Sequence, residues 1–194
     1  IIKLLILLLV SCSLSAKAGV VKISGSLKQF GLDRVSMNSD GIAAEVYHDR
    51  TIEIILDSNG RFDLKLKLKQ PAYYKVGHNT LYLTPGDDLE IIFNRNTTKT
   101  TFNGKGIEAN NYLRNSAKLS GCEIAKIGRE LNEFGLPKEK VSFEVYRYKV
   151  DSIVDASLDA LAHLTAVTPE FRELEQIRLE ACRLATYLDY FSVG

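Results

Sequence analysis

The chain has 194 residues, enough for one or two domains, and its 45% hydrophobic and 25% charged residues are an ordinary globular balance. The formal net charge is +1, and it becomes about −1 if Lys3 and Lys17 leave with a cleaved leader. This balance, with no basic stripe between aromatic residues, excludes electrostatic attraction to nucleic acid, so no nucleic-acid partner is expected.

The first 18 residues have the pattern of an export signal. Lys3 precedes an apolar run over residues 4–10, and small residues follow. The run is too short to span a bilayer in the mature protein. Cleavage after Ala18, at an A-x-A sequence, is one processing route; lipidation of Cys12, in a sequence that resembles a lipobox, is another, and an uncleaved core helix is a third. The first two predict an exported protein of the periplasm or cell envelope, and lipidation would add a membrane attachment.

Residues 19–103 alternate apolar and polar side chains, which predicts strands. Seven or eight short strands at intervals of about 8–12 residues indicate an antiparallel β-sandwich, because parallel strands would show continuous apolar runs. Gly25 interrupts the first strand and is expected to mark a bulge. The expected strands are 20–28, 32–38, 51–56, 61–68, 72–76, 81–84, 89–93 and 100–103.

Tight turns separate several of these strands. Thr84-Pro85-Gly86-Asp87 has the proline and glycine of a type II turn, so residues 81–93 are predicted to form a hairpin. Asp57–Gly60 ends in Asn-Gly, a hairpin signal, and Gly77-His78-Asn79 is expected to be a hairpin loop. Lys65, Lys67 and Lys69 are interpreted as the solvent face of a strand, guarding a sheet edge.

After Gly104-Lys105-Gly106, interpreted as a hinge, the apolar period changes to 3.6 over residues 107–191. Helices are predicted over 107–119, over 123–134, over about 20–25 residues from Phe143, and from the start signal Thr168-Pro169-Glu170. In the last helix one apolar stripe is expected to face the core, formed by Phe171, Leu174, Ile177, Ala181, Leu184, Leu188 and Phe191. The predicted fold class is therefore α+β, a sandwich followed by a separate bundle of three to four helices.

The candidates for chemistry have simpler structural explanations. Asp87 and Asp88, with Glu90 nearby, offer carboxylates for a cation or for acid–base work, but aspartate at a tight turn accepts backbone N–H bonds. The three histidines, His48, His78 and His163, show no metal-ligand spacing. No catalytic, cofactor-binding or metal-binding residue is predicted, and no cofactor is expected.

Two sets of residues leave alternatives open. Tyr73, Tyr74 and Tyr82 fall on adjacent predicted strands; they are either core and rim residues or an exposed face that stacks on a sugar. Cys122 and Cys182 either pair in an oxidising compartment or are small buried side chains on helices.

The order of short motifs resembles the N-terminal module of exported TlpA-type thiol-disulfide oxidoreductases of the thioredoxin-like family. The resemblance covers residues 20–190. It rests on Ile23-x-Gly25, Asp57-x-x-Gly60-x-Phe62, Pro71-Ala72, Leu83-x-Pro85-Gly86-Asp87, Phe102-x-Gly104, Asn110-Asn111-Tyr112-Leu113, Phe171-x-x-x-Glu175-x-x-Arg178 and Tyr187.

The resemblance implies a β-sandwich and a helical segment ahead of a thioredoxin domain that contains the catalytic W-C-x-x-C. The 194 residues include no Trp, and Cys122 and Cys182 do not match that pair. Two interpretations stay open, a thioredoxin domain after Gly194 or a protein of sandwich and helices alone. The expected function is non-catalytic: positioning, dimerising or recognising protein substrates for a downstream thioredoxin domain, with a homodimer among the expected partners. The alternative is a stand-alone envelope module that binds a glycan or peptide.

Overall fold

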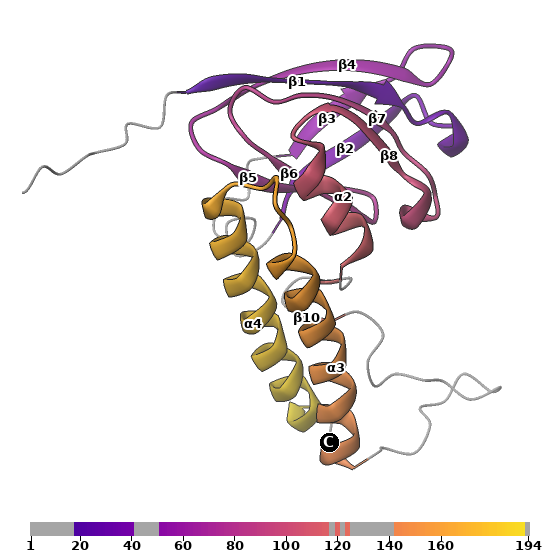
Figure 1. Cartoon of the computed structure of the whole chain (residues 1–194). Helices are drawn as coiled ribbons and strands as arrows, with labels where there is room; N and C mark the ends of the chain where they lie inside the picture. The colour runs from indigo at the N-terminus through magenta and orange to yellow at the C-terminus, as the bar shows by residue number, and fades with distance from the viewer. Residues whose placement is uncertain (1–17, 41–50, 117–118, 121–122, 125–141, 193–194) are drawn as a thin grey trace, which may run out of the picture.

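The computed structural model of the chain describes residues 18–40, 51–116, 119–120, 123–124 and 142–192 (Figure 1). In these residues, eight strands form two four-stranded sheets, and three α-helices follow along the chain. This confirms the α+β class with seven to eight strands in two sheets. The three helices include a long antiparallel pair that projects from the sandwich.

The first sheet has the order β4-β1-β7-β8. Its strands are β4 (Arg61–Leu68), β1 (Gly19–Ser26), β7 (Asp88–Ile92) and β8 (Thr101–Lys105). β1 pairs with β4 in antiparallel orientation, but it pairs with β7 in parallel. The fully antiparallel prediction is therefore wrong at this pair. Alternation of side chains in one strand does not distinguish the direction of its neighbour.

The second sheet has the order β3-β2-β5-β6, and all its pairs are antiparallel. Its strands are β3 (Thr51–Ile55), β2 (Arg34–Ser39), β5 (Ala72–Val76) and β6 (Asn79–Leu83). Two short 3-10 helices, η1 (Lys28–Phe30) and η2 (Thr97–Lys99), lie in the connections.

Two of the predicted hairpins are instead connections between the sheets. The turn at Thr84–Asp87 joins β6 of the second sheet to β7 of the first, and Asp57–Gly60 joins β3 to β4 in the same way. The turns themselves form, since the N–H of Asp87 donates to the Thr84 carbonyl at 3.0 Å. A turn sequence fixes the reversal of the chain but not the sheet that the next strand joins. The predicted hairpin loop after Val76 is confirmed, because β5 pairs with β6.

The sandwich core lies between the sheets and takes side chains from all eight strands. β4 alternates as predicted, with Phe62 and Leu68 buried and all of its charged residues exposed. β4 is also an edge strand, so the exposed lysines of this strand lie where the sequence interpretation put them. The buried core residues are Val21, Ile23, Leu27, Met37, Ile54, Leu56, Phe62, Leu68, Tyr74, Val76, Leu81, Leu83, Leu89, Ile91, Phe93 and Phe102.

Gly25 does not mark a bulge, because β1 keeps a continuous register with both of its neighbours. The glycine is needed for a different reason. Its φ is 156°, and a Cβ at this position would lie 1.8 Å from the carbonyl oxygen of Ile91 on β7. The parallel pairing of β1 with β7 therefore requires a residue without a side chain.

The helices are α2 (Ile107–Asn115), α3 (Phe143–Ala162) and α4 (Pro169–Ser192), and a two-residue strand pair, β9 (Leu119–Ser120) with β10 (Glu123–Ile124), follows α2. The helix predicted over 107–119 ends at Asn115, and the one predicted from Glu123 begins as a strand. Most of that second prediction lies outside the described residues. The start signal of α4 is confirmed, because the Phe171 N–H donates to Thr168 Oγ1 at 3.1 Å.

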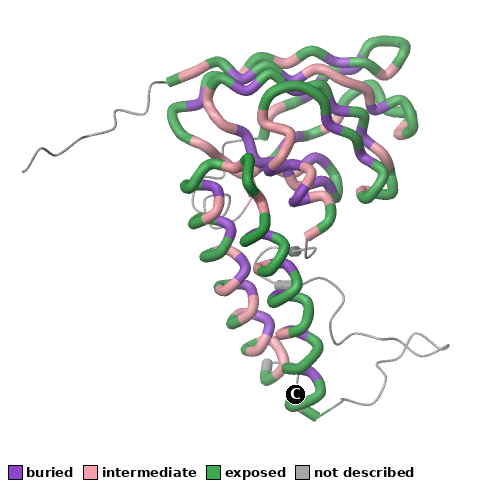
Figure 2. Tube along the Cα trace, in the orientation of Figure 1, coloured by how far each residue is buried: buried purple, intermediate pink, exposed green. Residues whose placement is uncertain are grey.

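α3 and α4 pack together, but α4 does not bury the stripe that the sequence predicts. The α4 residues that are buried are Phe171, Glu175, Leu179, Cys182 and Thr186. Figure 2 shows buried segments recurring along α4 between half-buried and exposed ones. Ile177, Leu184, Leu188 and Phe191 are exposed. The prediction was wrong because it grouped only apolar residues, whereas the buried face of α4 includes the charged residue Glu175.

Replacing Gly25 with alanine is expected to destabilise the fold by about 3 kcal/mol or more, because the new Cβ would overlap backbone atoms of β7. Gly77→Ala is the control, since Gly77 has φ 56° and no atom lies within 4 Å of the position that its Cβ would take. This variant is expected to lower the free energy of unfolding by roughly 1 kcal/mol, from left-handed backbone strain alone. Urea unfolding measures both. Equal losses of unfolding free energy in the two variants would contradict the close approach of Gly25 to the Ile91 backbone.

Candidate functional site

α2 is attached to the edge strand β6 by the side chain of Asn110, which is 0% exposed. The Tyr82 N–H donates to Asn110 Oδ1 at 2.9 Å, and Asn110 Nδ2 donates to the carbonyl oxygens of Tyr82 and Gly106, each at 2.9 Å. An amide presents one acceptor and two donors, so it makes the bonds that a neighbouring strand would make. Asn110 therefore ends the second sheet at β6 and fixes α2 on it.

The Thr84–Asp87 turn lies beneath the start of α2. Asp87 is buried, and its Oδ2 accepts the Thr84 N–H at 2.7 Å. A Cβ on Gly106 would lie 2.8 Å from Asp87 Oδ1, so the glycine allows the close contact. Burial raises the pKa of the Asp87 carboxyl, against the opposing effects of the Thr84 bond and Lys105. Asp87 has the turn role that the sequence favours, while Asp88 is exposed and lies 3.4 Å from Lys22 Nζ.

An aromatic cluster joins the sandwich to the helices, and we call this cluster the joint. Phe171 of α4 packs edge-on against Tyr82 of β6 and Tyr112 of α2, with ring centroids 4.7 and 6.0 Å apart. The Tyr112 hydroxyl donates to the Ser157 carbonyl of α3 at 3.0 Å. The buried residues of the joint are Tyr82, Ala109, Tyr112, Leu113, Leu161 and Phe171. One core thus contains side chains from β6 and from all three α-helices.

A buried ion pair lies beside the joint. Glu175 of α4 is 0% exposed; it accepts the Tyr73 hydroxyl at 2.9 Å and two bonds from Arg178 at 2.7 Å. The guanidinium carbon of Arg178 lies 5.1 Å from the centre of the Tyr73 ring. The carboxylate and the guanidinium satisfy each other, and Tyr73 ties both to β5.

Electrostatics keep the Tyr73 phenol and the Arg178 guanidinium each in one protonation state. Burial, together with the Glu175 carboxylate, raises the pKa of the Tyr73 phenol well above its ordinary value. Burial alone would lower the pKa of Arg178, but the bonds and charge of Glu175 outweigh it and raise that pKa. The phenol therefore stays protonated and the guanidinium charged, as a structural contact requires.

The tyrosines do not form an exposed stacking face. Tyr74 and Tyr82 are each 2% exposed, the first in the sandwich core and the second in the joint. Tyr73 packs against Tyr82 with centroids 5.0 Å apart and is partly covered by α4. The sugar-stacking alternative loses the residues on which it rested.

The remaining sequence candidates do not come together. His78 is exposed in the β5–β6 turn, and His163 ends α3, with its Nδ1 2.8 Å from the Asp159 carbonyl; His48 lies outside the described residues. Cys182 is buried in the α3–α4 core, and Cys122 lies outside the described part of the chain. Among the described residues, no three His, Cys, Asp or Glu side chains are grouped to hold a metal ion. No helix in that part is long and apolar enough to cross a membrane.

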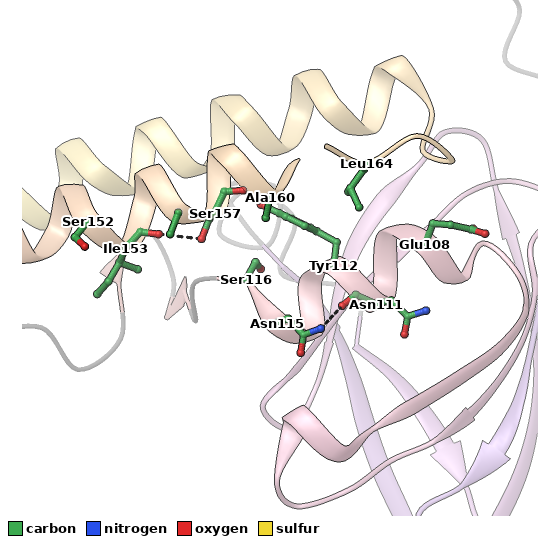
Figure 3. Close-up of a pocket in the computed structure, with 11 residues that line it drawn as sticks. Glu108, Asn111, Tyr112, Asn115, Ser116, Ser152, Ile153, Ser157, Ala160 and Leu164 are labelled. Atoms are coloured by element: carbon green, nitrogen blue, oxygen red, sulfur yellow. Dashed lines mark hydrogen bonds between the residues drawn. The ribbon is translucent and has the colours of Figure 1, made fainter. Parts of the chain in front are cut away.

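A groove of about 750 Å³ lies between α2 and α3, and Figure 3 shows its side chains. Tyr112, Ile153 and Leu164 give it apolar walls, and Ala156 and Ala160 leave room along α3. Asn111, Asn115, Ser116, Ser152 and Glu108 provide polar groups. Sequence reasoning missed this groove. The available signal was the row of small residues Ser152, Ala156 and Ala160, four apart on one face of α3.

A wide wall of small and apolar side chains with several amides and hydroxyls suits an extended peptide segment, whose backbone needs both donors and acceptors. Among the described residues that line the groove there is no paired acid and base, and no nucleophile with a base, of the kind that a hydrolytic site needs. Its side chains offer hydrogen-bond donors and acceptors along an apolar wall.

Comparison of the chain with protein-family models, with curated proteins and with solved structures finds no match. The class that the fold and site define is a β-sandwich with an attached helical hairpin and a groove beside the joint.

Glu175→Ala is expected to lower the free energy of unfolding by about 3–5 kcal/mol, because it leaves the nearly buried Arg178 without its carboxylate. The double variant Glu175→Leu with Arg178→Leu removes both charges, and its free energy of unfolding is expected to fall by less than that of Glu175→Ala. Asp88→Ala, at an exposed pair, is the control and should change stability by less than about 0.5 kcal/mol. Urea unfolding compares the three. A double variant less stable than Glu175→Ala would contradict the assigned role.

Proposed function

We propose that this chain is the non-catalytic N-terminal region of a cell-envelope thiol-disulfide oxidoreductase, which positions a downstream thioredoxin domain and recognises its protein substrates. The observation that supports this most is where the residues of the resemblance lie. Tyr112 packs against Phe171 in the joint, although the two are far apart in sequence. Asn110 bonds the backbone of Tyr82, a residue of the joint, and the Glu175–Arg178 pair lies beside it. Weak motifs that converge on one interface behave as parts of a single structural module.

The cysteine chemistry agrees with a non-catalytic role. Of the described residues, Cys182 is the one cysteine, and it is buried between α3 and α4. Thiol–disulfide exchange needs an accessible thiolate and a resolving thiol to release the mixed disulfide. In this proposal the redox pair belongs to the downstream domain, and the groove between α2 and α3 contacts the substrate.

The groove also favours a second candidate, a stand-alone envelope module that binds peptide segments. Its polar groups, from Glu108 on α2 to Ser152 on α3, offer donors and acceptors along the apolar wall without catalytic geometry. The two candidates differ in whether a thioredoxin domain belongs to the same protein.

Reading the gene downstream of the Gly194 codon tests the proposal. An in-frame Trp-Cys-x-x-Cys is expected, and the longer protein should reduce insulin disulfides while residues 19–194 alone should not. The same longer protein with both motif cysteines changed to serine is the control and should be inactive. A reading frame without the motif would contradict the proposal and leave the stand-alone binding module.

A further inference from the structure

α4 has a second apolar face, which lies apart from the α3 contact except at its C-terminal end, where the Phe191 ring packs against Phe143 of α3 with centroids 4.8 Å apart. Its members, which we call the α4 stripe, are Leu174, Ile177, Ala181, Leu184, Leu188 and Phe191. The five large side chains are 38, 59, 61, 68 and 64% exposed in that order. The buried face, by contrast, is formed by Phe171, Glu175, Leu179, Cys182 and Thr186. The helix is therefore apolar on two faces, one of which remains at the surface.

The spacing of the α4 stripe indicates what kind of surface covers it. The six residues follow one another at intervals of three, four, three, four and three, the a and d positions of a heptad repeat. Side chains at this spacing insert between the side chains of a second helix that runs alongside. A flat sheet or an extended peptide does not require this period. The spacing therefore suits a second helix with the same repeat.

We propose that α4 pairs with α4 of a second copy of this chain, in antiparallel orientation about a two-fold axis between Ala181 and Leu184. A two-fold axis brings the same patch of each copy together, so the stripe supplies both halves of the contact. The inference rests on α4 alone and is independent of the proposed function.

The sizes of the side chains favour the antiparallel orientation. It places Leu174 against Phe191 of the partner subunit, Ile177 against the partner's Leu188, and Ala181 against the partner's Leu184, so that no layer is empty. A parallel pair would set Ala181 against the partner's Ala181 and leave a void that costs stability. It would also set the two Phe191 rings against each other.

The charges and the shape of the molecule are compatible with this pairing. Glu180 borders the stripe, and its Oε2 lies 3.2 Å from Arg183 Nε of the same helix, so its charge is paired within each copy. α4 starts at the sandwich and extends away from it (Figure 1), so antiparallel pairing puts the two sandwiches at opposite ends of the helices. The exposed part of the stripe, roughly 500 Å² per copy, brings the pair close to the ~1,000 Å² of a small specific interface.

Sedimentation equilibrium of the full chain at concentrations around 1–100 µM tests the pairing. The wild type is expected to sediment as a dimer, and Ile177→Glu with Leu184→Glu is expected to raise the dissociation constant at least about 100-fold, because charges enter the apolar seam. Tyr148→Glu, at an exposed residue of α3, is the matched control and should remain dimeric. Circular dichroism checks that each variant stays folded.

A monomeric wild type over this range overturns the proposal, including the case in which another segment of the same chain covers the stripe. A dimer that persists in the double variant also overturns it, since the copies would then associate through another surface.

Cysteine cross-linking tests the orientation. Leu174→Cys with Phe191→Cys should form a covalent dimer on mild oxidation, because the antiparallel layer brings the two positions within the Cβ distance of a disulfide, about 4 Å. Each single variant, which keeps the native cysteines as the double variant does, should give no more covalent dimer than the wild type. Efficient cross-linking of Leu174→Cys alone would show a parallel pair and overturn the antiparallel assignment.

Discussion

The open backbone of the edge strand β6 is the constraint on which the rest of the structure depends. A buried N–H or C=O without a partner costs about as much as a lost hydrogen bond. At Tyr82 both groups are satisfied by the buried amide of Asn110. That contact sets the position of α2 on the sandwich, and α2 in turn places Tyr112 against Phe171 and Ser157. The positions of α3 and α4 therefore depend on the hydrogen bonds that Asn110 makes to the edge of β6.

The buried Glu175–Arg178 pair then fixes how α4 is rotated. A desolvated ion pair adds little to stability in general, but a buried carboxylate tolerates few arrangements in which all its bonds are kept. Here it must lie under Tyr73 and beside Arg178. This rotation buries Phe171, Leu179 and Cys182 and leaves Ile177, Leu184 and Leu188 at the surface. The exposed stripe follows from the position of a single acid.

Much of the fold could be predicted from local patterns. The alternation of β4, the β5–β6 loop and the cap of α4 depend on neighbouring residues, and each formed as predicted. The sheet that receives a strand after a tight turn depends on distant partners, so the connections at Thr84–Asp87 and Asp57–Gly60 were predicted as hairpins and cross between sheets instead. The joint and the ion pair beside it were harder to predict from the sequence, because Asn110 and Glu175 are polar residues whose burial depends on partners far along the chain.

Native-state hydrogen exchange followed by NMR is the most direct test of the claim that β6, α2 and α4 form one cooperative unit. The Tyr82 and Leu179 amides are predicted to exchange through openings of the same free energy. In Asn110→Ala both should lose protection by the same amount, about 2–3 kcal/mol for the buried backbone groups left unpaired at Tyr82. Loss of protection at Tyr82 with none at Leu179 would contradict the account, because the helices would then hold their place without the strand edge.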